Sequence, residues 1–152
     1  MKQLLIITAI ILGMGMSNCK KEDKVSSETS NQKFVSIVEI PTTDFSRAIG
    51  FYQTVLGITI EKMDMEGVQM GVFPESGDAA YVVLVKGNDY VPTKNGAVIY
   101  LNAGNDLQPT LDKIEKNGGK IIVNKTEISP EMGFFALFLD TEGNKLGLHS
   151  RN

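Results

Sequence analysis

The chain of 152 residues has very few of the side chains that build covalent or metal-bound frameworks. Its one cysteine is Cys19, so no disulfide bond and no cluster of thiolate ligands can form within the chain. Its one histidine is His149, so a metal site that needs two imidazoles cannot be assembled from a single copy. These counts still allow a Mg²⁺ or Ca²⁺ site built from carboxylates.

Neither charge nor hydropathy indicates a nucleic-acid-binding or membrane-spanning protein. The formal net charge is −3, and no basic patch is present, so we expect no nucleic-acid partner. Residues 4–18 carry no charge, but this run is shorter than the about 18 to 20 residues that a spanning helix needs. Because Lys2 supplies a positive start, we interpret residues 1–18 as a cleaved signal peptide.

Cys19 stands directly after this apolar run, in the string MSNC. The arrangement resembles the lipidated cysteine of bacterial lipoproteins and predicts a lipid anchor at Cys19. Several acyl chains would hold the protein on a membrane, since each buried methylene contributes about 0.8 kcal/mol. The resemblance therefore implies a protein of the bacterial cell envelope, on the periplasmic or surface side. The alternative is a plain signal peptide followed by an incidental thiol.

A polar segment separates Cys19 from the rest of the chain. Residues 20–33 (KKEDKVSSETSNQK) contain one aliphatic side chain, Val25, and no aromatic one. Such a segment buries too little apolar surface to offset the entropy of ordering, so we expect residues 19–33 to form a flexible tether. The folded domain is predicted over residues 34–152.

Residues 34–150 contain an internal repeat with a spacing of 62 positions. The repeated pairs include Asp44 and Asp106, Gly57 and Gly119, Phe73 and Phe135, and Leu84 and Leu146. Two copies of one supersecondary unit are the simplest explanation. We place these modules at residues 34–86 and 95–150.

Each module is predicted to contain a strand, a helix and three further strands. In the first module, Asp44 is a helix N-cap and Gly57 is the residue that ends the helix. Its strands are predicted at residues 34–40, 59–63, 68–73 and 80–85. The second module is predicted to have strands at residues 97–103, 120–123, 133–139 and 145–150 and a helix at residues 106–117. The sequence therefore predicts an α+β fold of two βαβββ units.

Three strings connect this arrangement with a known family: EIPTTDFSRAIGFYQTVLG, NGGKII and LDTEGNKLGLHS. Together with the two βαβββ units, they resemble the vicinal-oxygen-chelate superfamily, the group of glyoxalase I, bleomycin-resistance and extradiol-dioxygenase proteins. The resemblance covers residues 34–150. It implies an eight-stranded, open barrel-like sheet around a cavity, with the helices outside. We interpret the motif residues themselves as builders of this fold.

The positions that bind a metal in the superfamily carry no ligand here. They correspond approximately to Val35, a valine within residues 83–85, Ala97 and Gly147. None of these side chains has a donor atom for a metal ion. The expectation is therefore a domain without a cofactor, although a divalent metal held between two copies of the chain stays open, as does a homodimer.

Two titratable residues are candidates for chemistry at the cavity. His149 lies two residues after Gly147, so strand alternation puts both on one face, opposite Leu146 and Leu148. An imidazole there suits proton transfer or ligand orientation, and the alternative is an ordinary rim histidine. Glu39 is predicted to point inward among Ile37, Ile99 and Leu101 and to act as a base or a ligand contact; alternatively, it lies in solvent or caps the following helix.

The cavity is predicted to be lined by a small set of side chains from several strands. The set is Glu39, Met70, Tyr100, Phe134, Gly147 and His149. Methionine and aromatic side chains form adaptable apolar cavities, but core packing is the more common use for them.

Three functions are consistent with these features. The first is a lipid-anchored domain that binds a small, partly apolar molecule in the cleft without a metal. The second is a lyase or isomerase related to glyoxalase I, using Glu39, His149 or an interchain metal. The third is a cell-envelope interaction protein whose outer face binds a partner.

Overall fold

The computed structural model describes residues 34–75, 77 and 79–152, all of which fall in one compact unit. The predicted signal peptide (residues 1–18), lipidation site (Cys19) and tether (residues 19–33) lie outside the described residues. Within the part of the chain that the structure describes, no helix is long and apolar enough to cross a membrane.

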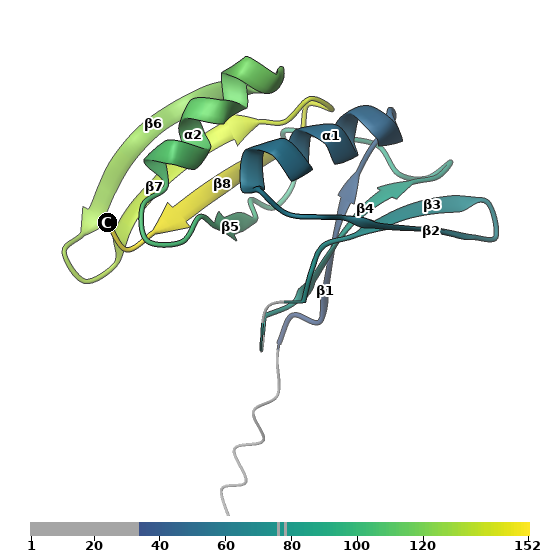
Figure 1. The fold of residues 1–152 in the computed structure, drawn as a ribbon, viewed down its shortest axis with the longest axis horizontal. Coiled ribbons are helices and arrows are strands. Elements are labelled where there is room, and N and C mark those ends of the chain that lie inside the picture. The colour runs from purple at the N-terminus through teal and green to yellow at the C-terminus, as the bar shows by residue number, and fades with distance from the viewer. Residues whose placement is uncertain (1–33, 76, 78) are drawn as a thin grey trace, which may run out of the picture. The chain divides into compact units, whose positions relative to one another are not determined.

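The first module forms a four-stranded mixed sheet with one helix. Its elements are β1 (Ile37–Pro41), α1 (Phe45–Leu56), β2 (Glu61–Met65), β3 (Val68–Val72) and β4 (Tyr81–Lys86). The strand order is β1-β4-β3-β2, with β1 and β4 parallel and the other pairs antiparallel (Figure 1). Strand β1 therefore lies at one edge of this sheet.

The second module repeats this topology. Its elements are β5 (Tyr100–Asn102), α2 (Gln108–Ile114), the 3₁₀ turn η1 (Glu115–Asn117), β6 (Lys120–Ser129), β7 (Gly133–Leu139) and β8 (Lys145–Ser150). The order is β5-β8-β7-β6, with only β5 and β8 parallel. The predicted pair of βαβββ units is confirmed, and the eight strands are divided between two sheets that do not close.

Helix α1 begins and ends where the sequence predicts. The Asp44 side chain accepts a hydrogen bond from the Arg47 backbone N–H at 3.1 Å, as an N-cap does. Gly57 has a φ of 70°, and its N–H donates to the Gln53 carbonyl at 2.9 Å. A left-handed backbone is easiest for glycine, so the helix stops there. Helix α2 starts two residues later than Asp106, whose carboxylate instead accepts from the Gln108 N–H at 3.0 Å.

The strand pairing corrects the ungapped repeat. Leu84 lies opposite Ile40, and Leu148 lies opposite Leu101; all four side chains belong to the core. Leu84 is thus equivalent to Leu148, two residues beyond the Leu146 that a spacing of 62 predicts. The difference arises because β6 has ten residues and its pairing with β7 contains three register shifts, which lengthen the second hairpin.

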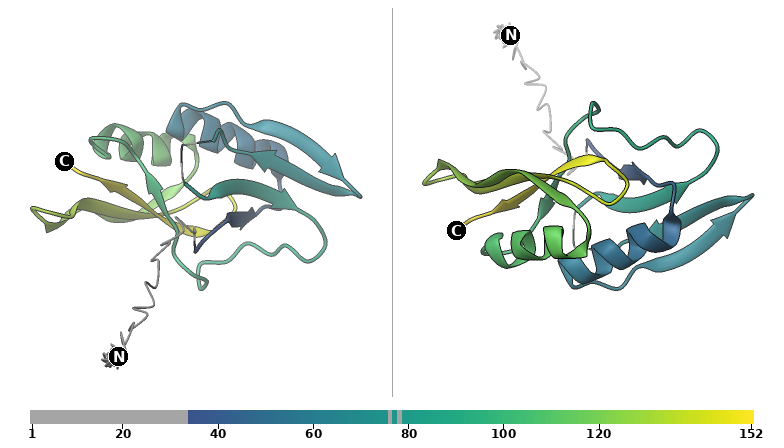
Figure 2. Two further views of the ribbon diagram at one scale, coloured as in Figure 1. Left: turned by 90° about the horizontal axis from the view of Figure 1, so that it is seen from below. Right: turned by 90° about the horizontal axis from the view of Figure 1, so that it is seen from above.

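The core lies between the helices and the helix-facing sides of both sheets. Helices α1 and α2 lie side by side on the same side of the sheets (Figures 1 and 2). Their buried side chains pack on alternate strand residues; the fully buried members include Tyr52, Val55, Leu84, Leu111, Ile114 and Leu148. Alternation therefore assigns the neighbouring residues of each strand to the opposite face.

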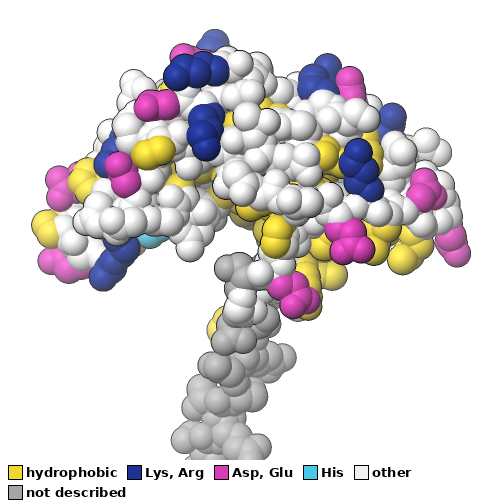
Figure 3. All heavy atoms as spheres, viewed as in Figure 1, with side chains coloured by type: hydrophobic (Ala, Val, Ile, Leu, Met, Phe, Trp, Pro, Cys, Tyr) yellow, Lys and Arg dark blue, Asp and Glu magenta, His cyan; other side chains and the backbone are white. Residues whose placement is uncertain are grey.

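That opposite face is open and partly apolar. Ile37 on β1 is 60% exposed and Met65 on β2 is 59% exposed, because both alternate with residues that face the helices. Figure 3 shows hydrophobic side chains on the underside of the β2–β3 region. The eight strands thus leave one broad face uncovered instead of enclosing a barrel.

Candidate functional site

Two hollows adjoin the edge strand β5. The larger, which we call the apolar hollow, has a volume of about 740 Å³ and lies between β5 and residues of the first module. Most of its lining is aliphatic or aromatic, including Val38, Leu56, Ile58, Phe73, Val82 and Ile99. The smaller, which we call the polar hollow, has a volume of about 560 Å³. Its lining is Tyr100, Asn102, Gly104, Asn105, His149, Ser150 and Arg151.

Strand β5 separates the two hollows and contributes to both. Tyr100, Asn102 and Gly104 line each of them. Tyr100 pairs with Gly147 on β8, and a Cβ added to Gly147 would overlap the Tyr100 ring. The absence of a side chain at Gly147 therefore lets the tyrosine ring lie flat against β8. One bound molecule can contact both hollows along this strand.

The His149 ring is fixed in one orientation by the backbone. Its Nε2 lies 2.7 Å from the carbonyl oxygen of Met132, in the turn between β6 and β7. A carbonyl only accepts, so Nε2 carries the hydrogen, and in the neutral ring Nδ1 has a lone pair. Leu146 and Leu148 face the core on the other side of β8. His149 thus lines the polar hollow from the face of β8 opposite Leu146 and Leu148.

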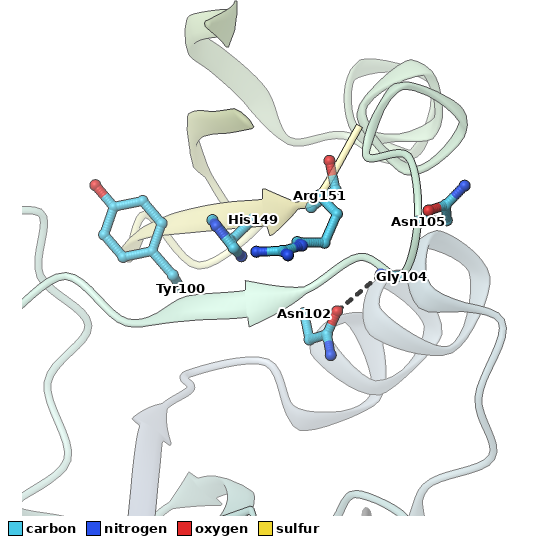
Figure 4. Close-up of a pocket in the computed structure, with 7 residues that line it drawn as sticks. Tyr100, Asn102, Gly104, Asn105, His149 and Arg151 are labelled. Carbon is cyan, nitrogen blue, oxygen red and sulfur yellow. Dashed lines mark hydrogen bonds between the residues drawn. The ribbon is translucent and has the colours of Figure 1, made fainter. Parts of the chain in front are cut away.

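Arg151 follows β8 and is held by the same turn. Its Nη1 donates to the Glu131 carbonyl at 2.7 Å. Gly133 lies so close to the chain at Ser150 and Arg151 that an added Cβ would overlap their backbone. The Arg151 side chain extends back toward the His149 ring, and in the same view the Asn102 side chain lies across the β5 ribbon from it (Figure 4). The guanidinium is thus positioned by the fold and not left on a loose chain end.

The two asparagines of the polar hollow use their amide oxygens within the protein, and their amide nitrogens are turned away from the Arg151 guanidinium (Figure 4). The Asn102 Oδ1 accepts from the Gly104 backbone N–H at 2.9 Å, and the Asn105 Oδ1 accepts from the Asn152 Nδ2 at 2.7 Å. Their own Nδ2 groups have no acceptor among the described residues. The two amides therefore keep unused N–H donors at the edge of the hollow.

Glu39 lies elsewhere, in contrast to the predicted apolar setting. Its side chain is exposed, it lines neither hollow, and its charge raises the pKa of the Tyr90 phenol nearby. Leu101 points to the helix side of its sheet, so it cannot surround Glu39 on the opposite face. The alternative prediction of a solvent-exposed Glu39 describes the observed position. The structure does not bring Glu39 and His149 into one site.

Two other predicted cavity residues also take different positions. Phe134 packs against the core, with the Lys125 Nζ 4.7 Å from its ring centroid. Phe135, one residue later, lies on the Tyr100 face, with a distance of 6.4 Å between ring centroids. Met70 is half-buried on the uncovered face and lines neither hollow. On β7, Phe134 thus points to the helix side of the sheet and Phe135 to the opposite face, so the prediction that Phe134 lines the cavity is wrong.

The residues at the expected metal positions do not fit a metal ion. Val35 is 55% exposed and precedes β1, Val83 is buried on β4, Ala97 precedes β5, and Gly147 lies under Tyr100. Their side chains offer no oxygen, nitrogen or sulfur atom. Across residues 34–75, 77 and 79–152, no three His, Asp or Glu side chains converge in a way that suits a metal ion.

Sequence reasoning missed Asn102, Asn105 and Arg151. Strand alternation could have indicated two of them, because Asn102 lies two residues after Tyr100 and Arg151 lies two residues after His149, so each pair points to the same face. Asn105 has no such signal, since it lies in the connection between β5 and α2.

Comparisons with known proteins agree with this architecture. Residues 34–148 match the family model of the Glyoxalase/Bleomycin resistance protein/Dioxygenase superfamily. A glyoxylase-like domain-containing protein of Didymella fabae is 32% identical over 127 residues, which cover 77% of this chain and 93% of that protein.

Solved structures share the fold at low identity. TnmS3, an antibiotic binding protein from Streptomyces sp. CB03234, is 19% identical with a TM-score of 0.61, covering 80% of this chain and 98% of that one. A mutant of glyoxalase I from Zea mays is 20% identical with a TM-score of 0.60, covering 76% of this chain. The chain spans only 46% of that enzyme's length.

Proposed function

Because the chain belongs to the glyoxalase/bleomycin resistance protein/dioxygenase superfamily, we propose that its domain binds a small, partly apolar organic molecule beside β5, without a metal at the superfamily's usual positions. The apolar hollow is the observation that carries this proposal. Its volume of about 740 Å³ lies within the range of about 300 to 1,000 Å³ that is common for small-molecule sites. An antibiotic binding protein is among the structural neighbours, which supports binding as a use of this fold.

Filling the apolar hollow tests the proposal. Thr110 on α2 lines the hollow, whereas Thr54 on α1 is exposed and does not. The probe is N-phenyl-1-naphthylamine, an uncharged fluorophore, added to the full chain carrying Cys19→Ser. We expect saturable binding that Thr110→Phe weakens at least tenfold and Thr54→Phe leaves unchanged, with circular dichroism confirming that both variants fold. Absence of saturable binding, or an equal effect of both variants, overturns the proposal.

A second candidate, a lyase or isomerase related to glyoxalase I, is favoured by the fixed tautomer of His149. With Nε2 protonated, Nδ1 is the atom that would accept a proton from a substrate. Turnover of an oxoaldehyde that disappears in the double variant His149→Asn with Glu39→Gln would place this candidate first. Activity lost with His149→Asn alone, and kept in Glu39→Gln, would exclude a role for Glu39.

A metal held between two copies of the chain is tested separately. The protein is incubated with Zn²⁺, Ni²⁺, Mn²⁺ and Fe²⁺, desalted, and subjected to elemental analysis. Our proposal predicts substoichiometric metal, because the side chains at the corresponding positions lack donor atoms. One retained ion per chain or per two chains would contradict it.

We also propose that Cys19 carries a lipid that anchors the protein to the bacterial cell envelope. The apolar run of residues 4–18, directly before the cysteine, supports this assignment. Metabolic labelling with palmitate should mark the wild type and the control Ser17→Ala but not Cys19→Ser, which should move to the soluble fraction. An unlabelled, soluble wild-type protein would contradict the anchor.

A further inference from the structure

The polar hollow differs in charge from the rest of the molecule. Its lining includes the cationic Arg151 and the imidazole of His149, but no aspartate or glutamate. The chain as a whole has a formal net charge of −3. Among the described residues, no carboxylate lies within ion-pair distance of the Arg151 guanidinium. The charged side chain that lines this hollow is therefore positive, in a protein whose formal net charge is negative.

The hydrogen bonds of the two asparagines occupy their acceptor oxygens and leave their N–H donors free. The Oδ1 atoms of Asn102 and Asn105 are both occupied, so each amide offers its two N–H groups. Arg151 uses one of its five N–H groups on the Glu131 carbonyl. The free N–H groups of Arg151, together with those of the two asparagines at the edge of the hollow, match the acceptor-only surface of an oxyanion, which forms strong charge-assisted hydrogen bonds.

The donors are also held in place. The Asn152 N–H donates to the Asn105 carbonyl at 2.8 Å, and the Ser150 hydroxyl donates to a main-chain oxygen of Asn152 at 2.6 Å. Together with the close approach of Gly133, these bonds fix the segment that carries Arg151. A preorganised donor set loses less entropy on binding than a flexible one.

The apolar hollow continues from this site across β5. Tyr100, Asn102 and Gly104 line both spaces, so a molecule whose acidic group lies at Arg151 can extend its body among aliphatic side chains. The one carboxylate among the described residues of the apolar hollow is Glu75, whose Oε1 accepts from the Tyr81 hydroxyl at 2.8 Å. Glu75 disfavours an anionic group in the apolar hollow, and Arg151 favours one in the polar hollow.

We infer that the bound molecule is an amphipathic organic oxyanion, with its acidic group in the polar hollow at Arg151, Asn102 and Asn105 and its apolar body in the apolar hollow. This inference rests on the proposed binding function and names its ligand class. The bound acid contributes the oxygens, and the protein contributes N–H donors; no covalent step is involved.

A pair of probes that differ only in charge tests the inference. 8-Anilinonaphthalene-1-sulfonate has the rings of N-phenyl-1-naphthylamine plus one sulfonate. We expect the anionic probe to bind the Cys19→Ser chain at least tenfold more tightly than the neutral one. Equal affinities for the two probes would overturn the inference.

An isosteric variant isolates the donors. Asn102→Asp keeps the Oδ1 that accepts from the Gly104 N–H but replaces the free N–H₂ group with a negative oxygen. This variant should weaken the binding of the anionic probe at least tenfold and change the affinity for the neutral probe less than twofold. Asn124→Asp is the matched control, because Asn124 is exposed on β6 and lines neither hollow. An equal effect of both variants on the anionic probe would attribute the change to net charge and overturn the inference.

Removal of the cation gives a second, independent variant. Arg151→Gln should weaken the binding of the anionic probe at least fivefold. The control Lys116→Gln removes an exposed cation from η1 and should leave the affinity for this probe unchanged. If Thr110→Phe affects neither probe, the proposed binding function fails. If Thr110→Phe weakens the neutral probe but Asn102→Asp and Arg151→Gln leave the anionic probe unchanged, only the oxyanion inference fails.

Discussion

The hydroxyl of Tyr52 on α1 donates a hydrogen bond to the carboxylate of Asp140 at 2.7 Å, across 88 positions of the sequence. Tyr52 is 1% exposed and Asp140 is 4% exposed. The same carboxylate accepts from the backbone N–H groups of Glu142 and Asn144, both at 2.9 Å. A buried charge is tolerated when such donors satisfy it. Two of the three strings that carry the family resemblance, those containing Tyr52 and Asp140, therefore contact each other.

Removal of the Tyr52 hydroxyl should destabilise the domain. Tyr52→Phe leaves the ring in the core but takes one donor from a buried carboxylate, at a cost of about 1.5 to 3 kcal/mol. Tyr81→Phe removes a similar phenol–carboxylate bond, to Glu75, at the surface and should change stability by less than about 0.5 kcal/mol. Urea unfolding of both variants gives the comparison; equal effects would mean that burial does not set the cost.

Asn144 should not tolerate an isosteric carboxylate. Its Nδ2 donates to the Pro41 carbonyl at 2.8 Å and to the Asp140 carboxylate at 2.9 Å. Asn144→Asp replaces this donor with an acceptor between two acceptors, so we expect a loss of about 3 kcal/mol or more at pH 7. Asn124→Asp, at an exposed position, should cost less than about 0.5 kcal/mol. Thermal unfolding measures both, and a small loss at Asn144 would contradict the network.

The domain should lose stability in acid because Glu142 stabilises it only when ionised. Burial raises the pKa of this carboxyl, but hydrogen bonds from Asp44, Thr43 and Arg47 outweigh burial and hold the pKa below its usual value. The salt bridge to the Arg47 Nη2 spans 2.8 Å. A lowered pKa in the folded state means that the stabilisation is complete above the unfolded pKa and is lost as the pH falls through the folded one.

The substitution Glu142→Gln measures this contribution. At pH 7 we expect a loss of about 2 kcal/mol, because several hydrogen bonds to a charged acceptor become bonds to a neutral one. The difference between wild type and variant should shrink as the pH falls below the ordinary glutamate pKa of about 4.3. The control Glu127→Gln changes an exposed residue on β6 and should give a small difference at every pH. A difference for Glu142→Gln that stays constant with pH would argue against this linkage.

Gly147 should resist even a methyl group. An added Cβ would overlap the Tyr100 ring, so Gly147→Ala has to displace that ring from β8, at a cost of about 1 to 3 kcal/mol. At Gly50 on α1, an added Cβ would meet no atom within 4 Å, and Gly50→Ala should stabilise the helix by about 0.5 to 1 kcal/mol. Opposite signs in urea unfolding are the expected result; the same sign at both sites would contradict the packing argument.

Local rules in the sequence determined most of the architecture. The N-cap at Asp44, the left-handed stop at Gly57 and the repeated βαβββ order depend on a few neighbouring residues, so they are visible without tertiary contacts. Alternation likewise placed His149 opposite Leu146 and Leu148. Family resemblance then supplied the arrangement of the modules.

Only the tertiary structure decided which face of each strand meets the helices and which distant groups meet each other. Phe134 packs into the core and Glu39 lies in solvent because register and helix packing set the parity of their strands. The sites of Asn105 and Arg151 depend on contacts with Asn152 and Glu131, which no local pattern encodes. Backbone preferences act over a few residues, whereas the polar hollow exists only after both sheets and the chain end have packed.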